Sequence, residues 1–334
     1  MAEELRRIDV HHHIAPPAYL AAVGSEVGPP LQKWSLAKSL EDMDEGGVAT
    51  AIVSVTQLSM RLDRRDALRA LARSCNDFAA RLVADHRGRF GMFAALPMPD
   101  IDASLEEIAY GMDVLKADGV GLYTSYRDKW LGDPAFDPVL AELDRRKAVI
   151  YVHPATPDCC VNLVPGMQDA NIEYGTDTTR AIARMIFGGA ARRFPNIRMI
   201  WSHAGGTMPF LIERFMRTAT FPEFRKLLPG GFLPEAQRFY YDTAQASNKV
   251  ALTAARMVIP PSHFVFGTDY PYRGALEHVE GLRQSGVFDN WELRGIDRTN
   301  LSGILPQYAN DRQVGAEGRL SASASASAAA GARS

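Results

Sequence analysis

The sequence predicts a (β/α)8 TIM barrel, an α/β fold in which eight parallel strands form a closed ring inside a layer of helices. Eight short apolar runs recur along the chain, and most are followed by a helical pattern, an alternation that is typical of a parallel sheet. Side chains of metal-ligating type end the first, fifth, sixth and eighth runs. A closed barrel brings its first and eighth strands side by side, which an open sheet does less readily. We therefore expect the closed form.

The eight predicted strands are short apolar stretches separated by polar or helical segments. They are Leu5 to Val10, Ala49 to Val55, Arg89 to Leu96, Gly119 to Tyr123, Ala148 to Val152, Ile197 to Ser202, Arg238 to Asp242 and His263 to Phe266. The first run is not followed by Gly-x-Gly-x-x-Gly, and the sequence contains no Walker loop. Nucleotide-binding α/β folds are therefore disfavoured.

Helices are predicted in the stretches between these runs. They include Leu36 to Glu45, Asp66 to Asp85, Asp102 to Ala117, Asp137 to Arg146, Thr176 to Arg192 and Thr207 to Thr218, with a last helix or two in Trp291 to Leu305. In the fifth of them, Ile182, Met185 and Ile186 recur at helical spacing and predict a buried face. The arginines of the same stretch, such as Arg180 and Arg184, are most simply a solvated face.

Length and composition are those of an ordinary globular protein. The chain has 334 residues, of which 46% are hydrophobic and 23% charged, with a formal net charge of −2. This charge argues against nucleic acid or an anionic membrane as the main partner. The sequence has no apolar run near the roughly 20 residues that span a bilayer and no signal-peptide pattern, so we expect a cytoplasmic protein. The three cysteines, Cys75, Cys159 and Cys160, imply no disulfide framework.

One domain is expected over residues 1–317, because α/β barrels routinely exceed about 250 residues as one unit. Gly318 to Ser334 is rich in Ala, Ser and Gly and lacks the apolar bulk to offset its chain entropy, so we expect a disordered tail. Proline pairs and clusters predict longer loops, and those on the ligand side are natural substrate lids. These loops are Pro16-Pro17, Pro29-Pro30, Pro154 to Pro165 and Pro229 to Pro234.

The first apolar run leads into three consecutive histidines, His11, His12 and His13. Alternate side chains of a strand share a face, so His11 and His13 point together while His12 points away. Two imidazoles on one face are the beginning of a metal site. A tag remnant is the bland alternative, but tags seldom follow an Ile-Asp-Val strand and lead into a Pro-Pro turn.

A catalytic zinc site usually has about three or more protein ligands, so other strand ends must supply the rest. His153, His203 and Asp269 each follow an apolar run. Either histidine alone is more simply a structural histidine with its hydrogen bonds satisfied. Their common position at strand ends favours one shared site, since an α/β barrel gathers those ends at one face.

Together these motifs resemble the metal-dependent amidohydrolase superfamily, in the branch of aminocarboxymuconate-semialdehyde decarboxylase and aromatic-acid decarboxylases such as 6-methylsalicylate decarboxylase. The similarity covers about residues 5–310. The residues that carry it are Asp9-Val10-His11-His12-His13, His153-Pro154, His203-Ala204-Gly205-Gly206, Gly267-Thr268-Asp269-Tyr270-Pro271, Asp177-Thr178-Thr179-Arg180 and Phe239-Tyr240-Tyr241-Asp242-Thr243-Ala244.

The resemblance implies one divalent metal, commonly zinc with manganese possible, held by His11, His13, His153 and Asp269. It implies that His203 stands beside the metal-bound water as a catalytic acid or base, a role that Asp269 is also placed to share. Binuclear relatives carry a carboxylated lysine on the fourth strand, and Gly119 to Tyr123 offers none, so a single metal is expected.

The resemblance also implies a homodimer or higher homo-oligomer. The semialdehyde decarboxylase has an arginine that reaches into the neighbouring subunit's site, and Arg214 stands at the matching place, eleven residues after His203. A guanidinium can hold a substrate carboxylate by two parallel hydrogen bonds. The alternative is that Glu213 and Arg214 form a solvated helix face.

Three functions are compatible with such a site to different degrees. The first is non-oxidative decarboxylation of a hydroxylated, salicylate-like or unsaturated carboxylic acid. The second is hydrolysis of a lactone, ester or amide, because the same ligands lower the pKa of a bound water toward ~7. The third, a binding protein with a structural metal, is disfavoured because structural zinc sites are closed and rich in cysteine.

Overall fold

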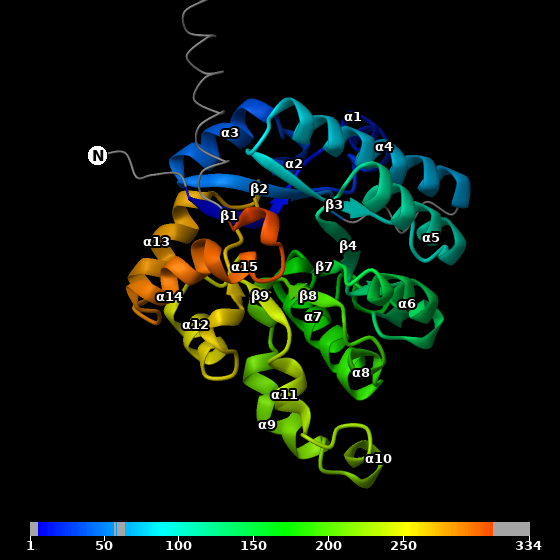
Figure 1. The fold of residues 1–334 in the computed structure, drawn as a ribbon, viewed down its shortest axis with the longest axis vertical. Coiled ribbons are helices and arrows are strands. Elements are labelled where there is room, and N and C mark those ends of the chain that lie inside the picture. The colour runs from blue at the N-terminus through cyan, green and yellow to red at the C-terminus, as the bar shows by residue number, and fades with distance from the viewer. Residues whose placement is uncertain (1–5, 57, 59–63, 310–334) are drawn as a thin grey trace, which may run out of the picture.

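The computed structural model describes residues 6–56, 58 and 64–309, and in these residues eight parallel strands form one sheet in the order β1-β2-β3-β4-β7-β8-β9-β10 (Figure 1). A separate antiparallel pair, β5 and β6, follows β4. The strands are β1 Arg7–His13, β2 Val48–Ser54, β3 Phe90–Ala95, β4 Gly119–Tyr123, β5 Ser125–Tyr126, β6 Lys129–Trp130, β7 Val149–His153, β8 Arg198–Trp201, β9 Tyr240–Asp242 and β10 Phe264–Val265.

The first and last strands of the sheet meet, as the sequence predicts. The backbone N–H of Val10 donates to the carbonyl of Phe266 at 3.0 Å, and that of His13 donates to Tyr270 at 2.8 Å. In return, the N–H of Asp269 donates to the carbonyl of His11 at 2.8 Å. These bonds join β1 to the segment after β10, so the expectation of a closed (β/α)8 barrel is confirmed.

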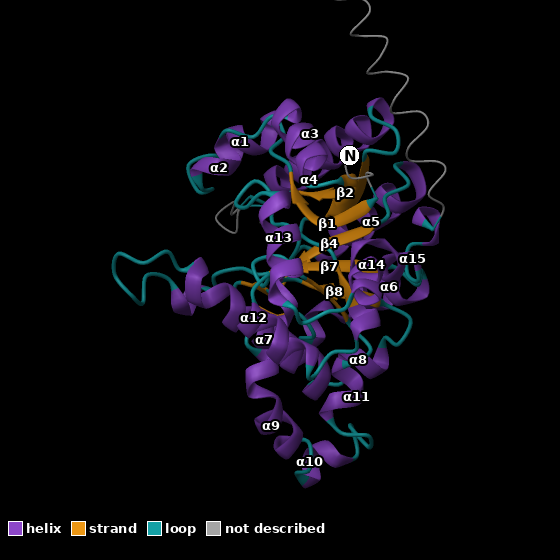
Figure 2. Ribbon diagram, turned by 90° about the vertical axis from the view of Figure 1, so that its left-hand side faces the viewer, coloured by secondary structure: helices purple, strands orange, loops and turns teal. Residues whose placement is uncertain are grey.

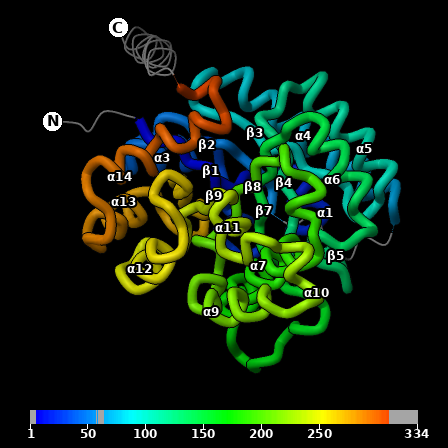
Figure 3. Tube along the Cα trace, turned by 60° about the horizontal axis from the view of Figure 1, so that its bottom comes forward, coloured from blue at the N-terminus to red at the C-terminus, as the bar shows by residue number. Residues whose placement is uncertain are grey.

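Helices surround this ring of strands (Figures 2 and 3). They are α1 Pro17–Val23, α2 Pro29–Gln32, α3 Leu36–Glu45, α4 Arg65–Asp85, α5 Ile101–Ala109, α6 Asp137–Arg145, α7 Ala170–Phe187, α8 Ala190–Arg193, α9 Met208–Thr218, α10 Pro222–Arg225, α11 Phe232–Ala236, α12 Lys249–Arg256, α13 Ala275–Ser285, α14 Asn290–Arg294 and α15 Asn300–Ser302. The predicted buried face of α7 is confirmed, since Ile182, Met185 and Ile186 are buried there. No helix in the described part of the chain is long and apolar enough to cross a bilayer.

Several element boundaries differ from the predictions. Strand β1 does not stop at Val10 but continues through His13, because the three histidines are fully buried and their backbone still pairs with β2. Two prolines expected in loops, Pro17 and Pro29, instead begin α1 and α2, where the fixed φ of proline suits the first helical position. The predicted helix Asp102 to Ala117 is α5 followed by a π-helical turn.

An apolar cluster fills the barrel interior at the end where the strands begin. It combines inward-facing residues of the strands with two residues from the C-terminal segment, which close the end of the barrel where the strands begin. The cluster comprises Ile8, Val10, Ile52, Phe93, Val149, Tyr151, Ile200, Val265, Leu301 and Leu305. The polar side chains come later along the same strands. They therefore gather at the opposite end of the barrel, where the strands finish.

Two further predictions concern the cysteines and the C-terminal tail. The cysteines Cys75, Cys159 and Cys160 are free, as expected. The tail Gly318 to Ser334 lies outside the described residues, so its expected disorder stays a prediction.

Candidate metal centre

Four side chains from three separate strand ends converge at the carboxyl face of the barrel. His11 and His13 come from β1, His153 ends β7, and Asp269 lies in the segment after β10. One ligand atom from each lies within 4.8 Å of all the others, and all four residues are buried. Among the described residues this is the one such group, so the structure brings together all four of the expected ligands.

The three imidazoles are oriented so that their Nε2 atoms face the common centre. Nε2 of His11 and Nε2 of His13 are each 3.1 Å from Oδ1 of Asp269, and 3.1 Å from each other. On the far side of each ring, Nδ1 has a protein partner. Nδ1 of His11 donates to Asp242, Nδ1 of His13 lies 3.3 Å from the Ser54 hydroxyl, and Nδ1 of His153 donates to the carbonyl of Pro154. Asp242 and the Pro154 carbonyl can only accept, so they fix the tautomers of His11 and His153 in which Nε2 is free to bind a metal, and the Ser54 hydroxyl permits the same tautomer of His13.

The Nε2 atom of His153 gives an independent indication that these residues fit a metal. It is buried, and no hydrogen-bond partner for it exists among the described residues. Its ring lies 4.8 Å from that of His13 and 5.2 Å from that of His11, centroid to centroid. A buried nitrogen lone pair without a partner is costly. A cation bound by the three imidazoles and Asp269 would satisfy it.

Charge at the site also suits a cation. Burial alone would lower the pKa of His11, but Asp269 and Asp242 on either side raise it to about 10. Burial lowers the pKa of His13 and holds that of His153 well below its usual value. Burial would raise the pKa of Asp269, yet the neighbouring histidines keep it well below its normal range. His13 and His153 are therefore neutral beside the ionised Asp269, whereas His11 carries a proton that a bound divalent ion would have to displace.

His203 stands beside these four residues without joining them. Its Nε2 lies 3.5 Å from Oδ2 of Asp269, the oxygen that faces away from His11 and His13, and its ring is 5.1 Å from that of His11. The Nε2 atom is buried and makes no hydrogen bond to the described residues. Its backbone has a φ of 54°, which is rare for a residue with a side chain. The arrangement is suited to passing a proton between His203 and Asp269.

Asp242 contacts both His11 and the backbone of His203, and the sequence did not predict a role for it. It ends β9, is fully buried, and accepts a hydrogen bond from Nδ1 of His11 at 2.8 Å. Its other oxygen accepts the backbone N–H groups of His203 at 2.8 Å and Ala244 at 3.0 Å. A signal was present, because a carboxylate ends the seventh apolar run.

Asp9 and His12 serve the barrel and not the metal centre. Asp9 accepts hydrogen bonds from the backbone of His11 and from both the backbone and the hydroxyl of Thr268. His12 points away from His11 and His13, as predicted, and lies between Asp9 and Ser39. This buried network ties β1 to the segment after β10 and so sets the position of Asp269.

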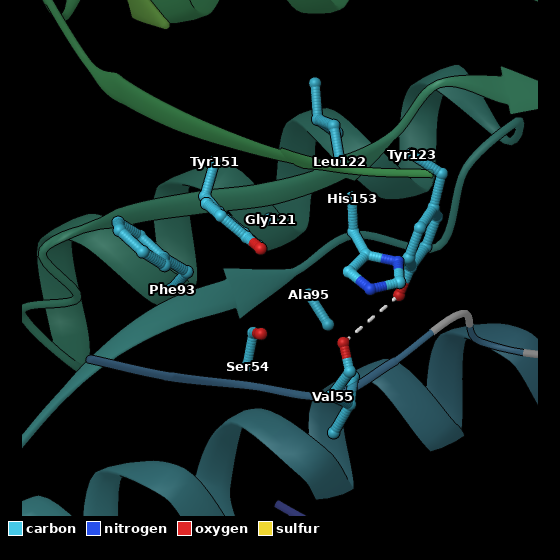
Figure 4. A pocket seen from close by; sticks show the side chains of 9 residues that line it. All are labelled: Ser54, Val55, Phe93, Ala95, Gly121, Leu122, Tyr123, Tyr151 and His153. Carbon is cyan, nitrogen blue, oxygen red and sulfur yellow. Dashed lines mark hydrogen bonds between the residues drawn. The ribbon is translucent and has the colours of Figure 1, made fainter. Parts of the chain in front are cut away.

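The wall of the site toward β2, β3 and β4 is formed by small and aromatic residues (Figure 4). Ser54, Ala95 and Gly121 lie there next to His153 and Tyr123, and the Tyr123 hydroxyl donates to the backbone of Val55 and Thr56. Strand β4 contains no lysine. The expectation of a single metal rests on this lack of a lysine and stays a prediction.

Two further tyrosines border the site. The ring of Tyr174, on α7, lies parallel to that of His203 at 6.5 Å and edge-on to that of His153 at 5.7 Å. The ring of Tyr272 lies 6.3 Å from that of His13. Burial raises the pKa of both phenols, that of Tyr272 to about 12, so both are neutral hydrogen-bond donors near pH 7.

Arg214 lies on α9, exposed to solvent, and forms no ion pair with any carboxylate of the described residues. With α10, this helix extends away from the barrel (Figures 1 and 2). The single chain therefore does not test whether Arg214 serves a neighbouring subunit, and this role stays a prediction.

Comparison with known proteins shows which family this site belongs to. The amidohydrolase family model matches residues 8–292, and the chain belongs to that family. The decarboxylase macB of Penicillium terrestre is 35% identical in sequence to this protein, in an alignment that covers 89% of this chain and 93% of the macB chain. The 6-methylsalicylic acid decarboxylase of Penicillium expansum is also 35% identical, in an alignment that covers 86% of this chain and 91% of the decarboxylase chain.

Solved structures agree with this fold. A 2,6-dihydroxybenzoate decarboxylase complexed with 2,6-dihydroxybenzoate superposes with a TM-score of 0.79 at 22% identity, covering 90% of this chain and 99% of that one. A dihydroxybenzoic acid decarboxylase from Polaromonas with bound manganese and 2-nitroresorcinol gives a TM-score of 0.76 at 21% identity, covering 90% and 97%. These structures show the same fold, and the family match together with the relatives at 35% identity confirms the predicted similarity to the amidohydrolase superfamily.

Proposed function

We propose that this protein is a metal-dependent, non-oxidative decarboxylase of a hydroxylated aromatic acid resembling 2-hydroxybenzoate. The observation that carries the proposal is the convergence of three Nε2 atoms and one carboxylate oxygen beside His203, in a chain whose relatives at 35% identity are named decarboxylases. One of these relatives is named for 6-methylsalicylic acid.

The residues at the centre fit a divalent ion, which His11, His13, His153 and Asp269 would hold through three nitrogens and one oxygen. We propose zinc, with manganese as the alternative, because imidazole and carboxylate ligands suit both. When bound, the ion supplies positive charge that binds and polarises a substrate oxygen. A solved structure of similar fold carries manganese, which is one reason to test both metals.

The protein's own residues would move the proton. In the reaction a proton adds to the ring carbon that bears the carboxylate, the bond from that carbon to the carboxylate breaks, its electron pair restores the aromatic ring, and carbon dioxide leaves. His203 and Oδ2 of Asp269, 3.5 Å apart, are the two groups placed to hold and deliver this proton. Tyr174 lies parallel to the His203 ring and narrows the space beside it, which favours a planar substrate.

We further propose that the enzyme acts in the cytoplasm as a homodimer, with Arg214 of one subunit holding the substrate carboxylate in the neighbouring site. The exposed position of Arg214 on α9 supports this, since its own chain offers it no acidic partner among the described residues. Phe210, Met216 and Phe221, on and just after the same helix, are all exposed, and such a group of exposed apolar residues is typical of a surface that another protein covers.

The alternative is hydrolysis, because the same side chains would support attack by a metal-bound hydroxide on a lactone, ester or amide. A mass balance separates the two reactions. Purified enzyme loaded with zinc or manganese is incubated with 2-hydroxybenzoate and its 6-methyl analogue, and separately with a panel of lactones and esters. We expect the acids to lose the mass of carbon dioxide without added oxygen or nicotinamide. Hydrated products from the esters, with the acids untouched, would assign the protein to the hydrolases.

A further inference from the structure

A strained turn after β9 places an uncharged amide against the proposed metal ligand Asp269. Gln245 has a φ of 55°, a backbone conformation that residues with side chains seldom adopt. Its Nε2 donates a hydrogen bond to Oδ2 of Asp269 at 2.8 Å. The direction of this bond is unambiguous, because a carboxylate oxygen accepts and the amide nitrogen is the donor.

The strain is shared by the three segments that meet here. His203 after β8, Gln245 after β9 and Asp269 after β10 have φ values of 54°, 55° and 67°. The surrounding structure holds Gln245 in place: its backbone N–H donates to Nε2 of His278 at 3.1 Å, and Nδ1 of His278 donates to the carbonyl of Gly274. Side chains held in rare backbone conformations cluster at functional sites, where neighbouring contacts maintain them.

The contact divides the two oxygens of Asp269 between different tasks. Oδ1 lies 3.1 Å from Nε2 of both His11 and His13 and is therefore the oxygen on the metal side. Oδ2 is held by Gln245 at 2.8 Å and faces His203 at 3.5 Å. If Oδ2 lost the amide donor, the carboxylate could rotate and present both oxygens to the ion.

We propose that Gln245 is a positioning residue that keeps Asp269 a one-oxygen ligand, so that a coordination position stays open for substrate and Oδ2 stays available to His203. The inference rests on the proposed function only in assuming a metal at Oδ1 of Asp269. Gln245 itself is not proposed to contact the substrate or the metal, and it acts only through its hydrogen bond to Asp269. Partners of ligand side chains typically change metal affinity or activity about 10–100-fold when removed.

The test uses cobalt(II) in place of the native ion, because the intensity of its visible absorption falls as the number of ligands rises. Gln245→Leu keeps the bulk of the side chain and removes the donor, whereas Gln245→Gly removes the donor and also relieves the positive φ. Gln237→Leu is the matched control, since Gln237 donates a comparable amide bond to the carbonyl of Val258 at 2.8 Å, between two segments outside the site.

Both Gln245 variants should bind one cobalt per chain but absorb more weakly than wild type, whereas Gln237→Leu should be unchanged. On an aromatic acid that wild type decarboxylates, their kcat/KM should fall about 10–100-fold. A Gln245→Leu spectrum identical to that of wild type would overturn the proposal. The spectrum needs no substrate, so it still decides the question if the protein proves to be a hydrolase. A wild-type protein that takes up no cobalt would overturn the metal site itself, and this inference with it.

Discussion

Nδ1 of His11 and Oδ2 of Asp242 lie 2.8 Å apart, with both side chains fully buried inside the barrel. The second oxygen of Asp242 accepts the backbone N–H of His203. The Asp242 carboxylate therefore orients the ring of His11, a proposed metal ligand, and fixes the backbone of His203, the proposed proton carrier. Asp242 itself neither binds the metal nor carries the proton in this proposal. Through this residue the geometry of β9 is coupled to that of β1 and of the segment after β8.

Asp242→Asn should weaken metal binding and turnover together. The amide retains one oxygen for His11 or for the backbone N–H of His203, but its NH2 group must then face the other donor. We expect metal affinity or activity to fall about 10–100-fold, measured by competition with a chelator and by steady-state kinetics. Asp118→Asn is the control, because Asp118 also accepts hydrogen bonds, from Met92 and Tyr308, away from the metal centre. It should lower stability and leave metal affinity unchanged.

Replacement of His153 by alanine should remove the metal. The Nε2 atom of His153 has no other buried partner among the described residues, so nothing else would compensate for the lost ligand. Elemental analysis should find about one divalent ion per chain in wild type and much less in His153→Ala, with activity lost in parallel. His86→Ala, at the end of α4, should retain the full metal content. A metal-free protein with full activity would refute the proposed centre.

His203→Asn should separate catalysis from metal binding. Asparagine keeps a polar side chain of similar reach but cannot exchange a proton, and His203 is not one of the four converging ligands. The variant should hold its metal and lose turnover by ~10²–10⁴-fold, the usual contribution of a general acid or base. Near-normal turnover would leave Asp269 as the one proton carrier.

Strand geometry explains why the sequence predicted that the candidate ligands lie close together. Alternation along β1 places His11 and His13 on one face, and parallel strands place His153 and Asp269 at the same end of the barrel. Periodicity predicts that these side chains lie at one end of the barrel, whereas the choice of these four as ligands, with His203 left out, came from the resemblance to the amidohydrolase superfamily.

The supporting residues were not predictable in this way. Asp242 occupies an inward position on a short strand, where a residue pattern alone does not distinguish a ligand from a hydrogen-bond acceptor. Gln245 reaches Asp269 only because its backbone adopts a positive φ. Such conformations depend on tertiary contacts, here with His278, and leave no periodic signal in the chain.

The stability of the protein should depend on pH through Asp42. Burial raises the pKa of this carboxyl from 3.8 to about 6, although it accepts the backbone N–H of Ala275 at the start of α13. A carboxyl whose pKa is raised by folding favours the folded state when protonated. Its contribution is therefore full below pH 3.8 and is lost as the pH rises through about 6. The full predicted loss is about 3 kcal/mol in the free energy of unfolding, most of it between about pH 4 and pH 7.5.

The comparison of wild type with Asp42→Asn isolates this effect. The asparagine side-chain oxygen can still accept from Ala275, and it does not titrate. Denaturant unfolding of both proteins should show wild type losing about 2 kcal/mol relative to the variant between about pH 4 and pH 7.5. Other titrating groups, the metal site included, are common to both proteins and cancel. A constant difference across this range would contradict the assignment.

Arg214 provides the test of assembly. It lies exposed on α9, one helical turn after the exposed Phe210. If it binds the substrate carboxylate in the neighbouring subunit, Arg214→Ala should lose most activity, and wild type should lose activity on dilution to monomer. Arg217→Ala is the matched control, because Arg217 is exposed on the same helix and lacks an ion pair among the described residues.

Hybrid dimers decide whether the arginine acts across the interface. A dimer of one Arg214→Ala chain and one His203→Asn chain has one site with both residues intact if Arg214 comes from the partner, and no such site if it acts within its own chain. Mixing the two inactive variants should then restore part of the activity, in proportion to the hybrid fraction measured by native mass spectrometry. Verified hybrids that stay inactive would return Arg214 to its own subunit or to the solvated surface. The same experiment therefore decides both the assembly and the source of the carboxylate-binding group.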